Sequence, residues 1–299
     1  MYQLISLLTG IMLAIMIFIN GRLTDTIGVF QATAVIHAVG VIFALVACLI
    51  RKEKPLPRSR SPWWFYTGGL VGVFTALSNN FAFGKISMTS IVALALLGQT
   101  VTSLIVDATG WFGMVKRPIR KSTLIGLTFC LLGIFMMLDH TVLEAALAVW
   151  FSFGAGISVV VSRSINARLA ERIGALPGSF VNHLAGLPVT VLLAFLAAEK
   201  MSLWAGMTPR LFWIYLGGGL GVLGVVLFNI LVPRISQFHL TVLAFVGQVL
   251  AGVVLDLAMG GFQVDASFLG GLVITGGIAL NLVIEYWAMR RERSPSSEV

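Results

Sequence analysis

The sequence has little charge, few cysteines and few histidines. Only 11% of its 299 residues are Asp, Glu, Lys or Arg, whereas a soluble domain carries about a quarter. Cys48 and Cys130 both fall in apolar stretches, so no disulfide framework is predicted. The sequence contains no nucleotide-binding P-loop motif, and its four histidines are scattered. These absences argue against a catalytic cluster, a metal site or a bound cofactor.

Long apolar segments dominate what is present. Apolar residues make up 58% of the chain, and its mean hydropathy is +0.97. A bilayer core of ~30 Å requires about 20 apolar residues per helix. Ten such stretches occur, at residues 2–20, 29–50, 63–83, 88–107, 122–139, 143–162, 175–198, 211–232, 240–259 and 267–289. The sequence therefore predicts an all-α polytopic membrane protein with ten transmembrane helices, whose main partner is the lipid bilayer.

Lysines and arginines are distributed unequally between the two sides of this predicted bundle. The side of the N-terminus holds Arg51, Lys52, Lys54, Arg58, Arg60, Lys116, Arg117, Arg120, Lys121, Arg163, Arg168, Arg172, Arg234, Arg290, Arg291 and Arg293. The other side holds Arg22, Lys85, Lys200 and Arg210. Because basic residues concentrate on the cytoplasmic side, both termini are predicted to be cytoplasmic. The net charge of +8 is thus a topology signal, and no nucleic-acid partner is predicted.

The chain contains an internal repeat. Arg22 and His37 recur 146 residues later as Arg168 and His183. With an offset of 149 the matching pairs are Asn80 and Asn229, Gln99 and Gln248, and Asp107 and Asp256. Fixed-offset similarity indicates a duplicated structural unit. We predict a first repeat at 1–141, a second at 142–290 and a polar cytoplasmic tail at 291–299.

The two predicted repeats have opposite orientations in the membrane. Each contains five helices, and after an odd number of crossings the second copy enters from the other face. Inverted repeats of this kind are typical of secondary transporters, in which substrates bind near the bilayer midplane between the repeats. A fused chain already contains both units, so it can work as a monomer.

Several short motifs resemble a known family. These are Asn20-x-Arg22-Leu23, Pro62-Trp63-Trp64, Val232-Pro233-Arg234-Ile235, and Gly-Gln followed by Asp eight residues later. They resemble the drug/metabolite transporter superfamily and, within it, the fused ten-helix form of the YdcZ-like family. The resemblance implies an EamA-like fold, a central cavity between helices 1–4 and 6–9, and the bacterial inner membrane. Small multidrug transporters of this superfamily use a glutamate in their first helix, whereas predicted helix 1 of this chain contains no acidic residue.

Four polar residues are candidate substrate-binding groups. His37 and His183 each lie about eight residues, or ~12 Å, from a helix end, which places them near the midplane. A neutral histidine exchanges protons near physiological pH, so the pair is also the candidate for proton coupling; hydrogen-bonded packing is the alternative. Gln99 and Gln248 lie near the centres of their helices, and their amides suit a polar, uncharged or zwitterionic substrate. Interhelical hydrogen bonding is the alternative for the glutamines.

Six further residues are candidate gate residues, because polar groups within a membrane usually face a cavity or a partner. They are Asn80, Asn229, Asp107, Asp256, Arg22 and Arg168. Pairing of the aspartates with the two arginines, which are expected in loops, would give one latch at each membrane face. Ordinary interfacial salt bridges and interhelix contacts are the alternatives.

The sequence therefore predicts a secondary transporter. It would move a small polar or amphiphilic molecule by alternating access between the repeats, with proton coupling through the histidines as an open possibility. A passive channel or facilitator and a membrane-embedded enzyme are the alternatives. A channel is expected to show rings of like charge or a filter motif, and the sequence contains neither.

Overall fold

The computed structural model describes residues 1–56, 61–82, 85–86, 88–117, 119–197, 212–259 and 264–293. These residues form helices and no strand. The long helices of the first half are α1 (Tyr2–Ile27), α2 (Val29–Ile50), α3 (Gly68–Ala82), α4 (Met88–Thr109) and α5 (Lys121–Met137). Those of the second half are α7 (Ala146–Ile173), α8 (Ala175–Leu196), α9 (Gly217–Leu231), α10 (Gln237–Met259) and α11 (Ala266–Arg293). Shorter helices are η1 (Trp63–Tyr66), η2 (Trp111–Gly113), α6 (Thr141–Glu144) and η3 (Phe212–Leu216).

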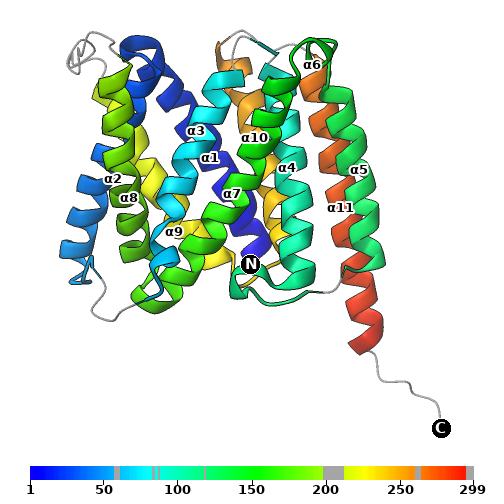
Figure 1. Cartoon of the computed structure of the whole chain (residues 1–299). Helices are drawn as coiled ribbons and strands as arrows, with labels where there is room; N and C mark the ends of the chain where they lie inside the picture. The colour runs from blue at the N-terminus through cyan, green and yellow to red at the C-terminus, as the bar shows by residue number, and fades with distance from the viewer. Residues whose placement is uncertain are drawn as a thin grey trace.

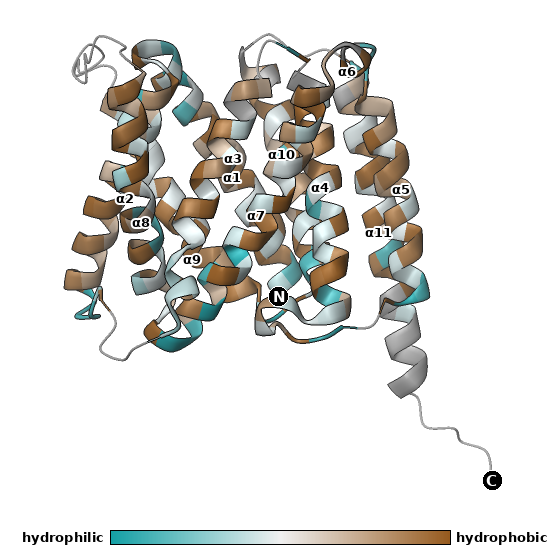
Figure 2. Cartoon of the chain, viewed as in Figure 1, coloured by the Kyte–Doolittle hydropathy of each residue, from teal (hydrophilic) through white to brown (hydrophobic). Residues whose placement is uncertain are grey.

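The ten long helices confirm the predicted fold class. Seven membrane-span candidates in the described residues are long and apolar enough to cross a bilayer, and three shorter apolar helices accompany them. Large apolar side chains such as Phe135, Trp150 and Phe195 are 70–75% exposed on the outside of the bundle, where a bilayer would cover them. Hydrophobic residues make up much of the bundle, and the N-terminus and the C-terminal end of α11 lie at the same end of it (Figures 1 and 2).

Two helices extend further than the sequence predicted. The first and sixth apolar stretches were expected to end at residues 20 and 162, but α1 continues to Ile27 and α7 to Ile173. Arg22 and Arg168, expected in loops, therefore lie within helices. The following helix begins directly after a single glycine in each repeat, Gly28 with φ 84° and Gly174 with φ 101°. Positive φ at glycine allows this abrupt reversal, so no loop is needed.

Equivalent helices of the two repeats pack in equivalent ways. Helix α2 packs against its counterpart α8, α5 against α11, and α4 against α10. The α1–α10 contact is likewise matched by α7–α4; Figure 1 shows α5 and α11 side by side at one edge of the bundle. The two five-helix units are thus related as an inverted pair, as the repeat predicted.

Glycines bring the repeats into close contact at matching positions. At the α1–α10 contact, a methyl group on Gly10 or Gly247 would collide with a backbone carbonyl of the other helix. At the α4–α7 contact, the same holds for the repeat-equivalent residues Gly98 and Gly156. Small residues allow helix backbones to approach closely inside a membrane, so these four positions set the spacing between the halves.

The symmetry is broken at the two ends of the bundle. Helix α9 packs against both α7 and α8, and the Asn229 Nδ2 donates to the carbonyl of Ala175 at 3.0 Å. Among the described residues, the equivalent helix α3 has no comparable packing against α1 or α2. The second repeat is therefore closed around α9 at the end that carries the termini, whereas α3 is not packed in this way against α1 and α2 in the described residues of the first repeat.

Candidate functional site

His37 and His183 meet at the centre of the bundle. Their ring centroids lie 5.9 Å apart, and each Nδ1 lies 2.9 Å from the carbonyl oxygen four residues earlier, on Thr33 or Ser179. Because a carbonyl only accepts hydrogen bonds, each Nδ1 carries the hydrogen. Each Nε2 of the neutral ring is consequently left as an acceptor.

Two equivalent glycines make room for these rings. A methyl group on Gly40 of α2 would collide with the His183 ring, and one on Gly186 of α8 would collide with the His37 ring. The reciprocal arrangement follows the inverted repeat. It holds both imidazoles in the same orientation relative to their own helices, beside a cavity that the two repeats share.

This central cavity has a volume of about 320 Å³. Six helices line it, three from each repeat: α1, α2 and α3, and α7, α8 and α9. Its polar lining residues are Asn20, His37, Thr75, Ser162, Arg163, Asn166, Asn182, His183 and Asn229. Leu13, Met16, Ile36, Val159, Val225 and Phe228 provide apolar surface. The cavity is therefore suited to a molecule with both polar and apolar parts.

The other predicted site residues are dispersed. Asn229 lines the central cavity, whereas Gln99 and Gln248 lie outside its lining on α4 and α10; substrate binding by the glutamines stays a prediction. The side chains of Asn80 and Asp256 lie outside the described residues.

Only one half of the predicted aspartate–arginine latch, Asp107 with Arg168, can be compared with the structure, because the side chain of Asp256 lies outside the described residues. Arg168 forms its ion pair with Glu171 one turn further along α7, and not with Asp107. Arg22 lies with its guanidinium carbon 5.3 Å from the Phe18 ring centroid on its own helix. Since α7 continues through Arg168, this arginine finds an acidic partner on its own helix; the pairing of Arg22 with Asp256 stays a prediction.

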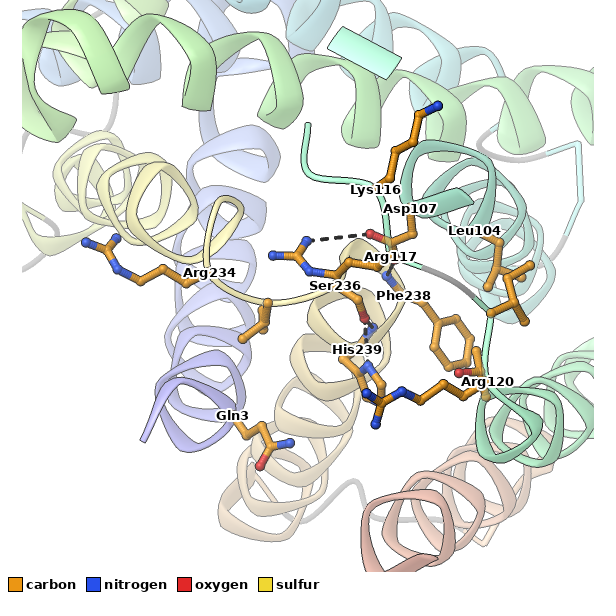
Figure 3. Close-up of a pocket in the computed structure, with 13 residues that line it drawn as sticks. Gln3, Leu104, Asp107, Lys116, Arg117, Arg120, Arg234, Ser236, Phe238 and His239 are labelled. Atoms are coloured by element: carbon orange, nitrogen blue, oxygen red, sulfur yellow. Dashed lines mark hydrogen bonds and ion pairs between the residues drawn. The ribbon is translucent and has the colours of Figure 1, made fainter. Parts of the chain in front are cut away.

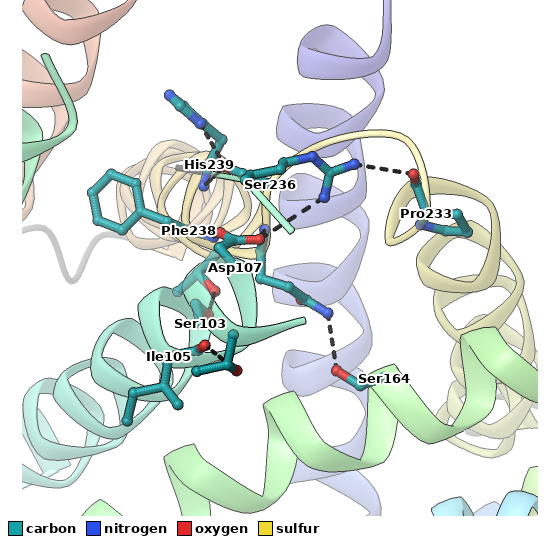
Figure 4. A network of polar contacts seen from close by, with 12 residues as sticks. Ser103, Ile105, Asp107, Ser164, Pro233, Ser236, Phe238 and His239 are labelled. Carbon is teal, nitrogen blue, oxygen red and sulfur yellow. Dashed lines mark hydrogen bonds and ion pairs between the residues drawn. The ribbon is translucent and has the colours of Figure 1, made fainter. Parts of the chain in front are cut away.

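Asp107 instead caps the N-terminus of α10. Its Oδ1 accepts from the backbone N–H of Gln237 at 2.8 Å, and its Oδ2 accepts from that of Phe238 at 2.9 Å. Arg117 lies 3.9 Å from Oδ1 and also donates to the Pro233 carbonyl at 3.0 Å. Figure 4 shows Asp107 between the end of α4 and the start of α10. A carboxylate at this position satisfies amides that the helix itself cannot pair.

Arg163 is the residue that sequence reasoning missed. Its side chain is buried, and it joins α7 to both α4 and α10. Nε donates to the Gln237 Oε1 at 2.7 Å, and Nη2 donates to the Thr241 Oγ1 at 2.6 Å and the Ser103 Oγ at 3.0 Å. The internal repeat does not reveal Arg163, because the equivalent residue 146 positions earlier is Ile17. The available signal was an arginine inside the long apolar segment that continues past residue 162.

A second cavity lies beyond this network, at the end of the bundle that carries the termini. Its volume is about 400 Å³. We call it the basic vestibule, because Lys116, Arg117, Arg120 and Arg234 line it, together with Asp107 and His239 (Figure 3). The bonds that connect Asp107, Gln237 and Arg163 therefore separate the vestibule from the central cavity.

Among the described residues, no group of three or more His, Cys, Asp or Glu is placed to hold a metal ion.

Ten helices in two inverted repeats around a shared polar cavity define a membrane transporter of the inverted-repeat class. The chain belongs to the YdcZ-like family of the drug/metabolite transporter superfamily. Residues 1–136 and 147–280 match this family, described as "Putative inner membrane exporter, YdcZ". The protein is accordingly a multi-pass inner-membrane transporter.

A solved structure titled "Crystal structure of protein" is similar in fold, with a TM-score of 0.73 at 17% sequence identity. The alignment covers 98% of this chain and 99% of the other. No curated protein matches this chain.

Proposed function

We propose that the protein is a secondary transporter that moves a small amphiphilic molecule through the central cavity by alternating access. The observation that carries the proposal is the central cavity itself, which both repeats build around the His37–His183 pair. Exchange of conformations between two inverted repeats converts a cavity open to one face into a cavity open to the other.

The unequal burial of equivalent helices supports this mechanism. On α7, Ser162, Arg163 and Asn166 line the cavity and are all buried. On the equivalent helix α1, the lining residues Met16 and Asn20 are only partly buried. The cavity is thus sealed toward the termini and more open toward the opposite face. With cytoplasmic termini, as the charge distribution predicts, this is an outward-open state.

A passive channel is less well supported by this arrangement. Continuous conduction requires a water-filled path through both ends. The buried bonds between Arg163, Gln237, Ser103 and Thr241 tie α7 to α4 and α10 across the end nearer the termini. A closed end beside an open cavity is the arrangement expected of a transporter trapped in one state.

Cysteine accessibility tests alternating access without knowledge of the substrate. In a Cys48→Ala/Cys130→Ala background, we expect Met16→Cys to react with a small membrane-impermeant thiol reagent from the face opposite the termini. Ser162→Cys should not react from the terminus-bearing face while that end is sealed, and should react from that face only after the conformations exchange. Oriented membrane vesicles distinguish the two faces.

Ile17→Cys provides the matched control, because Ile17 is adjacent to Met16 but is 55% exposed on the outside of the bundle. Lipid should shield the Ile17→Cys thiol from the water-soluble reagent added to either face. Simultaneous reaction of Met16→Cys and Ser162→Cys from both faces would indicate a channel. Protection of both in every condition would show that the cavity is closed packing and would contradict transport through it.

We further propose that the histidine pair couples transport to protons. The two rings lie 5.9 Å apart at the cavity wall, and histidine exchanges protons near neutral pH. The double variant His37→Gln/His183→Gln should lose uptake driven by a pH gradient and retain exchange of substrate across proteoliposomes at equal pH. Equal loss of both activities would assign the pair to binding or packing instead.

A further inference from the structure

We infer that the central cavity binds a small organic anion whose carboxylate pairs with Arg163. This inference rests on the proposed transport function and adds the chemical class of the substrate. Three features of the structure support it: a buried cation that makes no direct ion pair with a described acid, the apolar surface next to it, and the basic vestibule at the sealed end.

Arg163 is a buried cation with only indirect compensation, because Asp107 interacts with it electrostatically at longer range and shares Gln237 with it as a hydrogen-bond partner. Its side chain is 4% exposed, and no described acid lies within ion-pair distance of it. Nε and Nη2 donate to neutral oxygens, whereas Nη1 makes no hydrogen bond to any residue that the structure describes. The lining residues of the cavity include no Asp or Glu. A buried charge is costly unless it is paired, and a guanidinium pairs well with carboxylate.

The rest of the cavity indicates the shape of the anion. The guanidinium carbon of Arg163 lies 5.9 Å from the Phe228 ring centroid, and His183 lies beside Gly221. Phe228 and Gly221 are seven residues apart on α9, so Arg163 and the histidines are separated by ~10 Å along that helix. Leu13, Met16 and Val225 add apolar surface. One cation beside apolar surface suits a singly charged carboxylate with an apolar body, and not a multiply charged phosphate.

The basic vestibule is positively charged, like Arg163. Lys116 and Arg120 line it and form no ion pair with an acid in the described parts of the chain. The one lining acid, Asp107, is bound to the amides of α10. A basic cleft attracts anions and raises their local concentration. Gln237 connects the two cavities, since its Oε1 accepts from Arg163 and its N–H donates to Asp107. An anion leaving the central cavity at this end would enter a favourable potential.

Binding of matched acid and amide probes tests the inference. Benzoate, phenylacetate and hexanoate would each be compared with the corresponding amide, which has a similar shape without the charge. We expect the acids to raise the melting temperature of the purified full-length protein in detergent, and the amides to have no effect. Arg163→Gln should weaken apparent acid binding about 10- to 100-fold, and Arg163→Lys should retain part of it.

Arg172→Gln is the matched control, because Arg172 is an exposed arginine on the same helix and does not line the cavity; it should bind acids like wild type. If Arg163→Gln does not fold, the double variant Ser103→Ala/Thr241→Ala is used. This variant keeps the Arg163 guanidinium and removes two hydroxyl groups that accept hydrogen bonds from it. It should still bind acids. The inference is overturned if no acid stabilises the wild type, if amides do so equally well, or if Arg163→Gln retains full affinity.

Cysteine accessibility in oriented membrane vesicles, measured with the same ligands, separates the two proposals. If neutral or cationic ligands bind and the accessibility of Met16→Cys still alternates, the transport proposal stands and the anion inference fails. If accessibility never alternates with any ligand, the transport proposal itself fails.

Discussion

Asp107→Ala is expected to lower the free energy of unfolding by about 2–4 kcal/mol, because two buried backbone amides at the start of α10 lose a charged acceptor. Gln237 and Phe238 donate to this carboxylate, and Asp107 is 4% exposed. The substitution should also loosen the seal between the central cavity and the basic vestibule. The loss of stability is measured by denaturant titration in mixed micelles. Labelling of Ser162→Cys from the terminus-bearing face should increase in the same variant.

Two controls show whether the carboxylate at this site is responsible. Asp107→Asn keeps the shape and one acceptor oxygen, so its loss of stability should be smaller. Asp25→Ala removes an exposed aspartate near the end of α1, where surface charges contribute little, and should leave stability unchanged. Equal stability of Asp107→Ala and Asp25→Ala would show that the cap does not hold α10 in place.

Gly247→Ala is the second substitution with a large expected effect. An added methyl group would collide with the Leu7 carbonyl on α1, so α10 must move away from α1. Overpacking of this kind costs about 1–3 kcal/mol, and the contact joins the two repeats. We expect a lower melting temperature in detergent and less folded protein in the membrane. Gly98→Ala should behave alike, because its methyl group would collide with the Phe153 carbonyl at the equivalent contact.

Gly252→Ala is the matched control on the same helix. A methyl group there would meet no atom within 4 Å, so stability should be unchanged or raised by up to ~1 kcal/mol from the better helix propensity of alanine. A similar loss in Gly247→Ala and Gly252→Ala would mean that helix propensity, and not the approach of α1 and α10, determines the outcome.

The fold could be predicted from the sequence because the bilayer imposes a simple rule. A membrane span must be helical and apolar over about 20 residues, so the ten helices are visible in hydropathy alone. Their ends were harder to predict. Arg22 and Arg168 lie within α1 and α7, since long basic side chains can extend along a helix toward its end.

The candidate site was only partly predictable. The repeat singled out His37 and His183, because a feature shared by both halves is found by comparing the chain with itself. Arg163 has no repeat partner, so the same comparison could not find it. The partners of Asp107 also escaped prediction, because its contacts with Gln237 and Phe238 join residues 130 and 131 positions apart.

The sequence by itself determined the membrane class, the number of helices, the inverted duplication and the family, since each depends on the pattern of residues along one chain. Only the tertiary structure decided which end of the cavity is sealed, which acid pairs with which base, and that a buried arginine lines the cavity without a direct ion pair to any described acid. Those properties depend on distances between helices that are far apart in sequence. Two repeats with nearly the same sequence pattern occupy different conformations, and only their packing against each other distinguishes the open half from the closed one.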